Sequence, residues 1–359
     1  MIKGKFNLKQ HDYKKFSDWH DLLQNSITKP EELIRILPVD KSKIDRIIEY
    51  YPMRINPYYF SLIKHKNCPI GKQAVPDMQE IEDINILSDP DPLCEEIQSP
   101  VPNLIHRYPG RVLFMVSAEC AMYCRFCMRK RKVGYNSITD KTITMGLEYI
   151  KNNKSICEVV ISGGDPLLLE DEKIDRILKD LRAIDHIEIL RIHSRIPCTL
   201  PQRITKDLVD ILRQYHPLFI NIHFNHPDEI TEEAALACSA LADAGIPLGC
   251  QTVLLNGINN NAEIMKTLMK KLLMIRVKPY YIHQLDVVRG NHHFKATVKE
   301  GLNIMQSLYG YSGLCVPQYM IDLPGGGGKV PLLPQYFKTF SDDSISFINY
   351  EDKLFEYKI

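Results

Sequence analysis

An apolar run leads directly into three cysteines in the stretch Val112-Leu113-Phe114-Met115-Val116-Ser117-Ala118-Glu119-Cys120-Ala121-Met122-Tyr123-Cys124-Arg125-Phe126-Cys127. Cys120, Cys124 and Cys127 have the spacing C-x3-C-x2-C. Three thiolates are one short of the usual ligands of an iron–sulfur cluster, so the spacing predicts a cluster with one iron open to an exogenous ligand. Zinc sites commonly use paired C-x2-C motifs, and the single pair here favours a cluster over zinc.

Outward from the cysteines, the sequence alternates β-rich runs with helical stretches. The runs with strand character are 112–118, 158–162, 188–193, 218–224, 247–255 and 277–283, and the helical stretches are 142–152, 173–183, 206–214, 232–244 and 262–273. This alternation predicts an α/β fold with a parallel, barrel-like sheet, whose active site lies at the C-terminal ends of its strands. Residues with catalytic potential gather at those ends: Ser162-Gly163-Gly164-Asp165 and His193-Ser194-Arg195 after the second and third runs, His223 and Asn225 at the fourth, Gln251 on the fifth and Asp286 after the sixth.

Composition favours a soluble protein that acts on a small molecule. In 359 residues, 45 Lys and Arg nearly balance 44 Asp and Glu, which argues against nucleic acid as a partner. The apolar runs are shorter than the ~20 residues of a membrane span. Ten cysteines without a signal-peptide pattern predict a reducing cytoplasm. Outside the triplet the cysteines are isolated, and we assign them no chemistry.

The chain divides into three segments. Residues 1–105 combine charged helical stretches with a proline-rich, acidic linker at 77–102. Residues 106–295 hold the strand–helix alternation, and residues 296–359 begin with a helix at about 299–308. The tail from Phe337 onward is expected to form a loose hairpin or a docking strand.

A glycine run precedes Lys329 in Asp322-Leu323-Pro324-Gly325-Gly326-Gly327-Gly328-Lys329. Glycines allow a planar ligand or a phosphate to approach the backbone closely, and a lysine amine can condense with a carbonyl cofactor such as pyridoxal phosphate. Taken alone, the run would more often be a flexible loop that ends in an ordinary lysine. It is not a Walker loop, because Val330 stands where Ser or Thr is required.

The cysteine spacing after a strand, with Tyr123 and Phe126 beside the cysteines, resembles the radical S-adenosylmethionine (SAM) superfamily. The pairing of this triplet with Pro-Gly-Gly-Gly-Gly-Lys resembles the lysine 2,3-aminomutase family, over residues 18 to 340. Further stretches carry the resemblance in the same order: Arg107-Tyr108-Pro109-Gly110-Arg111-Val112-Leu113, Ile192-His193-Ser194-Arg195, Pro201-Gln202-Arg203-Ile204-Thr205 and His223-Phe224-Asn225-His226-Pro227.

The resemblance implies a partial (β/α)6 radical-SAM barrel, with an N-terminal helical segment and a short C-terminal segment that binds pyridoxal phosphate. It implies a [4Fe-4S] cluster on the three cysteines and pyridoxal phosphate on the catalytic Lys329, with Arg107 and Arg111 contacting that cofactor. The positions implied for SAM are Ser162, Gly163, Gly164, Asp165, His223 and Gln251. Arg129 would bind the substrate α-carboxylate; otherwise Arg129-Lys130-Arg131 would be a solvated basic loop.

Asp286 and Asp322 stand where the resemblance implies contacts to the distal ammonium of the substrate. Because a desolvated cation needs opposite charges, L-lysine is the expected substrate. A glutamate-specific relative should carry neutral or basic groups there. Three departures from the family pattern are His283 in place of tyrosine, Cys250 in place of asparagine and Asn261 in place of a distant cysteine, and structural zinc is not expected.

The expected reaction is a 1,2-shift of the amino group, L-lysine to β-lysine, in an isomerase of the cytoplasm. It would need a reductant such as flavodoxin or ferredoxin, and the expected assembly is a homo-oligomer with no nucleic-acid or membrane partner. Two alternatives stay open. One is an aminomutase of the same family that acts on glutamate or arginine, and the other is a non-catalytic barrel.

Overall fold

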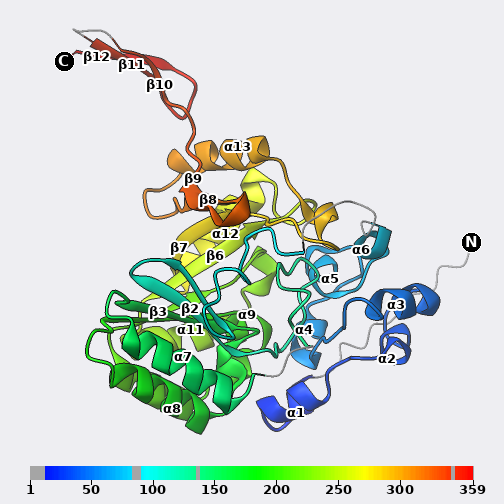
Figure 1. The fold of residues 1–359 in the computed structure, drawn as a ribbon. Coiled ribbons are helices and arrows are strands. Elements are labelled where there is room, and N and C mark those ends of the chain that lie inside the picture. The colour runs from blue at the N-terminus through cyan, green and yellow to red at the C-terminus, as the bar shows by residue number, and fades with distance from the viewer. Residues whose placement is uncertain (1–12, 83–89, 135–137, 341–343, 359) are drawn as a thin grey trace, which may run out of the picture.

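The computed structural model describes residues 13–82, 90–134, 138–340 and 344–358. Its centre is a nine-stranded sheet in the order β1 to β9 (Figure 1). The strands β2 to β8 run parallel to their neighbours, and β1 and β9 are antiparallel at the two edges. Their bounds are β1 Leu104–Tyr108, β2 Arg111–Ser117, β3 Glu158–Gly163, β4 Ile189–Ser194, β5 Leu218–Ile222, β6 Leu248–Leu254, β7 Lys278–Gln284, β8 Gln318–Leu323 and β9 Gly328–Pro331.

The predicted radical-SAM-type α/β fold, with six consecutive parallel strands, is confirmed by β2 to β7. The sheet also contains β1, β8 and β9, which the sequence analysis did not predict. Its two edges come together, because the backbone N–H of Lys329 in β9 donates to the Tyr108 hydroxyl at the end of β1, 2.9 Å away. The three-segment division stays a prediction, and the sheet crosses both of its boundaries.

Helices follow most of the parallel strands and cover the outside of the sheet (Figure 1). In α8, Ile174, Ile177, Leu178 and Leu181 are buried at the spacing of one helical face. The α13 helix begins with a capping box between Thr297 and Glu300. The bounds are α7 Asp140–Asn152, α8 Asp171–Arg182, α9 Ile196–Thr199, α10 Lys206–Leu212, α11 Glu232–Asp243, α12 Ala262–Met274 and α13 Val298–Tyr309.

The N-terminal segment folds against the cysteine loop. The Asn56 side-chain amide donates to the carbonyl oxygens of Ala121 and Thr199, at 3.1 and 2.8 Å. Glu80 is fully buried and binds Arg125, which lies inside the cysteine motif. The helices are α1 Trp19–Gln24, α2 Pro30–Ile34, α3 Lys41–Ile48, α4 Pro57–Ser61, α5 Pro69–Ala74 and α6 Gln79–Glu82; short 3₁₀ helices are η1 Tyr13–Lys15, η3 Pro166–Leu168, η4 Pro201–Arg203, η5 Arg213–Tyr215, η6 Pro227–Glu229, η7 His292–Phe294 and η8 Pro324–Gly326.

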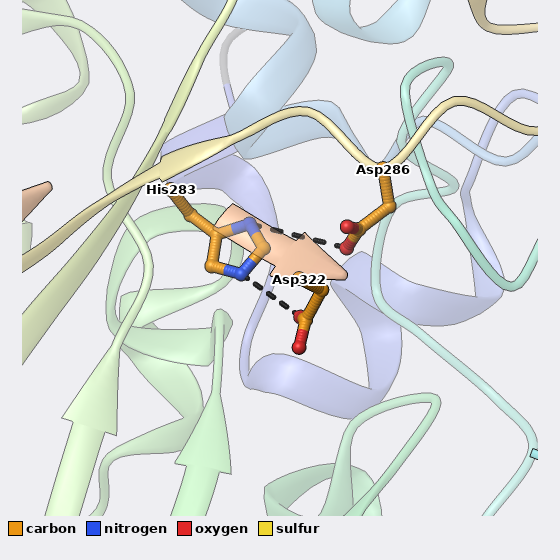
Figure 2. Close-up of side chains that lie close together, drawn as sticks. All are labelled: His283, Asp286 and Asp322. Atoms are coloured by element: carbon orange, nitrogen blue, oxygen red, sulfur yellow. Dashed lines mark hydrogen bonds and ion pairs between the residues drawn. The ribbon is translucent and has the colours of Figure 1, made fainter. Parts of the chain in front are cut away.

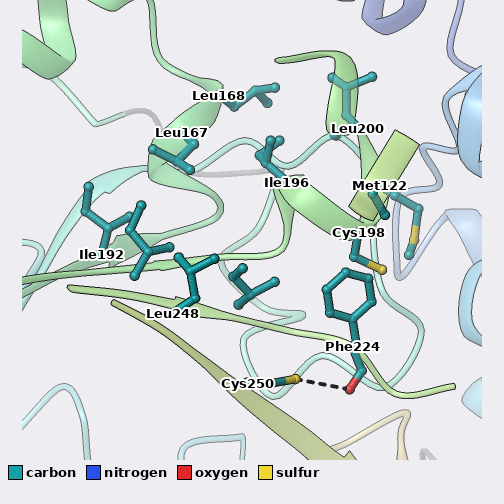
Figure 3. Close-up of a cluster of buried hydrophobic side chains, with 14 of the residues drawn as sticks. Met122, Leu167, Leu168, Ile192, Ile196, Cys198, Leu200, Phe224, Leu248 and Cys250 are labelled. Carbon is teal, nitrogen blue, oxygen red and sulfur yellow. Dashed lines mark hydrogen bonds between the residues drawn. The ribbon is translucent and has the colours of Figure 1, made fainter. Parts of the chain in front are cut away.

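One continuous apolar core joins the sheet to its helices. Figure 3 shows part of it, where Ile192, Leu248 and Phe224 pack with the side chains of Cys198 and Cys250. Both of these cysteines are buried, in agreement with their interpretation as small apolar residues. None of the described helices has the length and apolar character that a membrane crossing requires.

The C-terminal tail is a three-stranded antiparallel sheet that projects from the body near α13 (Figure 1). Its strands are β10 Phe337–Phe340, β11 Ser344–Ile348 and β12 Leu354–Lys358. The sequence analysis expected a hairpin or a single docking strand, so the tail holds one more strand than a hairpin. The turn before β12 reaches back to α13, where the Gln306 amide donates to Asp352 at 2.9 Å.

Candidate active site

Two adjoining cavities open at the C-terminal ends of the strands and together contain every site residue that the sequence analysis proposed. The first, of about 1080 Å³, is lined by Cys120, Cys124, Cys127, Arg129, Ser162, Gly163, Gly164, Asp165, His223, Gln251 and Asp286. The second, of about 940 Å³, is lined by Arg107, Arg111, Arg129, Ser162, Gln251, Asp322 and Lys329. Arg129, Ser162 and Gln251 line both, so they lie where the cavities meet.

The cysteine loop and the glycine motif after β3 depend on each other. A Cβ atom on Gly163 would lie 2.1 Å from the Ser117 carbonyl oxygen, and one on Gly164 would lie 2.4 Å from that of Glu119. Only glycine lets the end of β3 approach the start of the cysteine loop so closely. Burial raises the pKa of the Cys127 thiol to about 11, so a bound metal has to stabilise its thiolate.

Asp165 joins the ends of β3 and β4. Its carboxylate accepts hydrogen bonds from the Ser194 hydroxyl at 2.7 Å and from the Arg195 backbone N–H at 2.6 Å. Burial raises its pKa to about 6, although these hydrogen bonds oppose the shift. Both of its oxygens are occupied by protein donors, so Asp165 shapes the wall of the first cavity.

His223 lies in the wall of the first cavity, and Gln251 lies between the two. The Nε2 of His223 donates to the Asn225 side-chain oxygen at 3.0 Å, and its ring meets that of Phe126 edge-on, with centroids 5.7 Å apart. Burial lowers the pKa of His223 to about 3, so the ring is neutral and its Nδ1 is an acceptor. Such a ring can accept a hydrogen bond from a ligand without adding charge.

Lys329 reaches the second cavity through the tight hairpin of β8 and β9. Asp322 and Lys329 are direct cross-strand partners in this hairpin, and their side chains form an ion pair. The glycines make the turn, because Gly325, Gly326 and Gly328 have positive φ angles of 68°, 80° and 85°. The turn places Lys329 opposite Asp322, and the close approach of a ligand to these glycines stays a prediction.

His283 contacts the carboxylates of Asp286 and Asp322 (Figure 2) and also the amine of Lys329. Its Nδ1 lies 2.7 Å from the carbonyl oxygen of Gln284, which can only accept, so Nδ1 carries the hydrogen. Its Nε2 lies 2.6 Å from Lys329 Nζ and 3.1 Å from the Asp322 carboxylate. Asp286 lies 3.9 Å from Nδ1, and its carboxylate and that of Asp322 approach within 4.8 Å of each other.

The pKa values of Asp286 and Asp322 are shifted in opposite directions. Burial raises the pKa of Asp286, and the charge of Asp322 adds to that rise against the opposing effect of His283. Burial would also raise the pKa of Asp322, but the His283 hydrogen bond and the Lys329 charge outweigh it and hold that pKa well below its usual range. Asp322 already has an ammonium partner, whereas Asp286 has none among the described residues.

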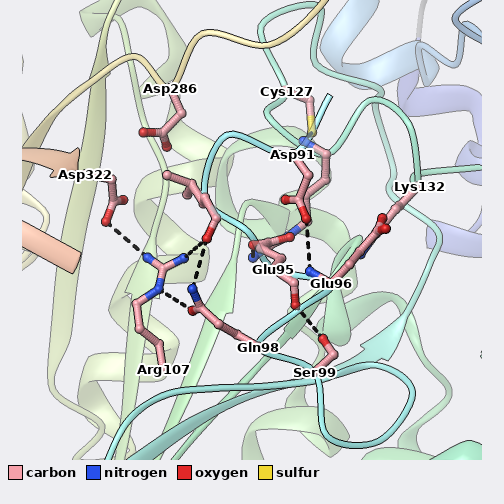
Figure 4. A network of polar contacts seen from close by, with 12 residues as sticks. Asp91, Glu95, Glu96, Gln98, Ser99, Arg107, Cys127, Lys132, Asp286 and Asp322 are labelled. Carbon is pink, nitrogen blue, oxygen red and sulfur yellow. Dashed lines mark hydrogen bonds and ion pairs between the residues drawn. The ribbon is translucent and has the colours of Figure 1, made fainter. Parts of the chain in front are cut away.

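The two arginines expected to contact a phosphate differ in how free they are. Arg107 donates to Gln98 at 2.7 Å and to the Leu93 carbonyl at 2.8 Å, and lies 3.4 Å from Asp322 (Figure 4). Arg111 stacks over the Tyr108 ring at 4.4 Å and makes no ion pair within the described part of the chain. A planar guanidinium in this state is available to an anion, so Arg111 fits a phosphate better than Arg107 does.

Arg129 is held by a residue that the sequence analysis did not single out. Its guanidinium forms a two-point ion pair with Glu95, at 2.6 and 3.2 Å. The neighbouring Arg131 pairs with Asp91 at 2.9 Å, so the acidic linker lies against the basic stretch after the third cysteine. Figure 4 shows Asp91, Glu95 and Glu96 of this linker near Cys127 and Lys132. The Glu95 carboxylate shows that this arginine can receive a carboxyl group in two-point geometry.

Comparison with known proteins places this arrangement in a family. Residues 115–270 match the radical SAM superfamily, and residues 305–358 match a family described as lysine-2,3-aminomutase. An L-lysine 2,3-aminomutase of Methanococcus maripaludis is 45% identical, over 98% of this chain and 84% of that protein. The chain belongs to the lysine 2,3-aminomutase family.

Relatives in this family carry more than one substrate name. An L-lysine 2,3-aminomutase of Clostridium subterminale is 45% identical, over 95% of this chain and 84% of that protein. A glutamate 2,3-aminomutase of Clostridioides difficile is 43% identical, over 94% of this chain and 82% of that protein. Overall sequence identity therefore does not tell which amino acid is the substrate. The radical SAM match implies an iron–sulfur cluster and SAM.

Several residues of this aminomutase-family site carried little signal in the sequence. Glu95 lies in a stretch interpreted as a linker, and its one signal was the acidic charge opposite Arg129-Lys130-Arg131. Tyr108 was noted only as part of a motif, although its hydroxyl fixes the Lys329 backbone. Arg195 was likewise quoted without a role, yet its guanidinium reaches Cys124.

Proposed function

We propose that this chain is an isomerase that interconverts L-lysine and β-lysine by moving the α-amino group to the neighbouring carbon. One observation carries the proposal: the cysteine triplet, Lys329 and two buried aspartates lie around adjoining cavities. A reaction that needs a radical source, a carbonyl cofactor and a bound ammonium requires these three parts together.

The residues present fit the groups that this reaction needs. Cys120, Cys124 and Cys127 would hold a [4Fe-4S] cluster, and SAM would lie against Gly163, Gly164, His223 and Gln251. Lys329 would carry pyridoxal phosphate, with Arg111 on its phosphate and Arg107 fixed beside it. When bound, these groups supply a carbon radical that removes a hydrogen atom and a conjugated system that stabilises the migrating nitrogen. A cytoplasmic reductant such as flavodoxin or ferredoxin would provide the electron.

Lys329 supports lysine as the substrate. Its amine lies between Asp322 and His283, and this placement supports the binding of a primary ammonium in this part of the cavity. A Lys329 that carries the cofactor would no longer offer its ammonium to Asp322, which would keep its contacts with His283 and Arg107. The ammonium of a lysine substrate would then restore the pair, with Asp286 as its second partner and Arg129 holding the α-carboxylate.

An aminomutase that acts on glutamate is the second candidate, favoured by the glutamate 2,3-aminomutase relative. Two buried carboxylates would repel the side chain of glutamate. A panel of lysine, glutamate and arginine, incubated anaerobically with both cofactors and a reductant, separates the candidates. Iron, sulfide and pyridoxal phosphate content after anaerobic purification tests the non-catalytic barrel, which predicts that all three are absent.

Lysine binding should weaken in acid because of Asp286. Asp286 can pair with the substrate ammonium only in its ionised form. Its pKa is raised above the ordinary value of 3.8. As the pH falls through that raised pKa, kcat/KM for lysine should fall, with KM rising. The pH profile of kcat/KM checks this expectation: Asp286→Asn should be slower throughout and lack the acid limb. An unchanged limb in this variant would assign it to another group.

We also propose that the enzyme is a homo-oligomer assembled through its tail. Phe337, Phe355 and Tyr357 are 44%, 53% and 65% exposed. The strand register places Phe337, Phe347 and Phe355 in one row across the projecting sheet. An exposed aromatic face of this kind is typical of an interface, and a second copy of the tail would cover it.

Replacing Phe355 and Tyr357 together with glutamate should therefore dissociate the assembly. The reason is that two charges would have to be buried against the partner. Light scattering after size-exclusion chromatography gives the mass directly, and Glu356→Gln on the opposite face is the matched control. A monomeric native protein, or a double variant that keeps the native mass, would rule out this interface.

A further inference from the structure

We propose that Arg195 raises the reduction potential of the iron–sulfur cluster through a hydrogen bond to the sulfur of Cys124. This inference rests on the proposed function in one respect, namely that the three cysteines hold a cluster. The Nη1 of Arg195 lies 2.8 Å from Cys124 Sγ. Arg195 comes directly after β4, where its backbone N–H is bound by the Asp165 carboxylate, so its starting point is fixed.

The remaining contacts hold the guanidinium on the sulfur. Its Nη2 donates to Gln73 and to Glu229, both at 2.7 Å, and the charged group lies 5.2 Å from the centre of the Phe126 ring. Glu229 is itself fully buried and accepts from the backbone N–H groups of Asn225 and His226. A side chain fixed on so many sides cannot turn away from Cys124 without leaving buried charges unpaired.

Cys124 is distinguished from the other two cysteines by this contact. Cys127 Sγ accepts a backbone N–H from Arg129 at 3.3 Å, and Cys120 receives no side-chain donor among the described residues. The charged donor therefore acts at one corner of the cluster. A hydrogen bond from a cation is stronger than one from a neutral group.

The direction of the effect follows from charge. Reduction adds one electron to the cluster and increases the negative charge on its sulfurs. A cationic donor 2.8 Å from one sulfur stabilises that charge, and burial keeps water from screening it. Arg195 should therefore ease electron entry from a weak biological reductant. It acts through the cluster ligand and so is a positioning residue for electron transfer.

The test is a potentiometric titration of anaerobically purified holoprotein, followed by electron paramagnetic resonance. In Arg195→Gln, the reduced-to-oxidised ratio at a fixed potential should fall at least tenfold, which is about 59 mV for one electron. Glu229→Gln should shift the potential the other way, because it leaves the Arg195 charge unbalanced. Arg203→Gln is the matched control, since Arg203 is buried and paired with Asp171 but lines neither cavity.

The possible results distinguish a failure of the Arg195 inference from a failure of the proposed function. An Arg195→Gln protein with full iron content and an unchanged potential would overturn the inference. If Arg195→Gln fails to hold a cluster, the potential of Glu229→Gln tests the inference instead. An unchanged or lowered potential in Glu229→Gln would also overturn it. Native protein that binds no iron would instead refute the proposed function, whatever the behaviour of Arg195.

Discussion

Replacing Lys329 with alanine is expected to abolish lysine turnover, by a factor on the order of 10³ or more. The lysine is held opposite Asp322 by the β8–β9 hairpin, with its amine against His283. Among the described residues, it is the one lysine that lines either cavity. Without it, pyridoxal phosphate would lose its covalent attachment, while the cluster would be unaffected.

Borohydride reduction followed by peptide mass spectrometry measures that attachment directly. The native protein should carry one modified lysine, at position 329, and Lys329→Ala should carry none while keeping its iron. Lys299→Ala is the matched control, because Lys299 is an exposed lysine of α13 outside both cavities. Modification of another lysine with retained turnover would show that the cofactor lysine lies elsewhere.

Loss of either ammonium-binding carboxylate should have the next largest effect. In Asp286→Asn or Asp322→Asn, the substrate ammonium is left with one buried partner. Breaking a buried ion pair costs about 3–5 kcal/mol, which is roughly 10²- to 10⁴-fold in kcat/KM for lysine. The effect should fall on substrate placement, since the three cysteines are the residues proposed to hold the cluster.

Uncoupled formation of 5′-deoxyadenosine separates this effect from general damage. Both variants should still cleave SAM with a reductant present, at a rate similar to that of the native protein. Asp243→Asn, on the exposed end of α11, is a control of the same chemistry away from the site. Native lysine kinetics in either site variant would refute the ammonium pairing.

Local sequence patterns predicted those parts of the site that are formed by residues close together in the chain. The spacing of Cys120, Cys124 and Cys127 and the strand–helix alternation are visible in the sequence, because each depends on neighbouring residues. The parallel strands then bring Gln251 and Asp286 to the same end of the sheet. Topology alone was therefore enough to gather residues that lie far apart in the chain.

Contacts made by irregular segments could not be predicted in this way. Glu95 binds Arg129 from a stretch without regular structure, and no periodicity marks such a residue. Lys329 and Asp322 face each other because of a glycine turn, whose positive φ angles are known only from the folded chain. Likewise, the role of histidine in place of tyrosine at position 283 depends on the folded chain, in which its Nε2 lies beside both Lys329 and Asp322.

The most direct measurement is anaerobic incubation of the purified protein with L-lysine, SAM, pyridoxal phosphate and a reductant, followed by separation of the amino acids. The arrangement of Lys329, Asp286 and Asp322 predicts β-lysine, formed in many turnovers and absent without SAM. Formation of β-glutamate from glutamate with no product from lysine would contradict the proposed substrate. No product from any amino acid, with both cofactors bound, would contradict the proposed reaction itself.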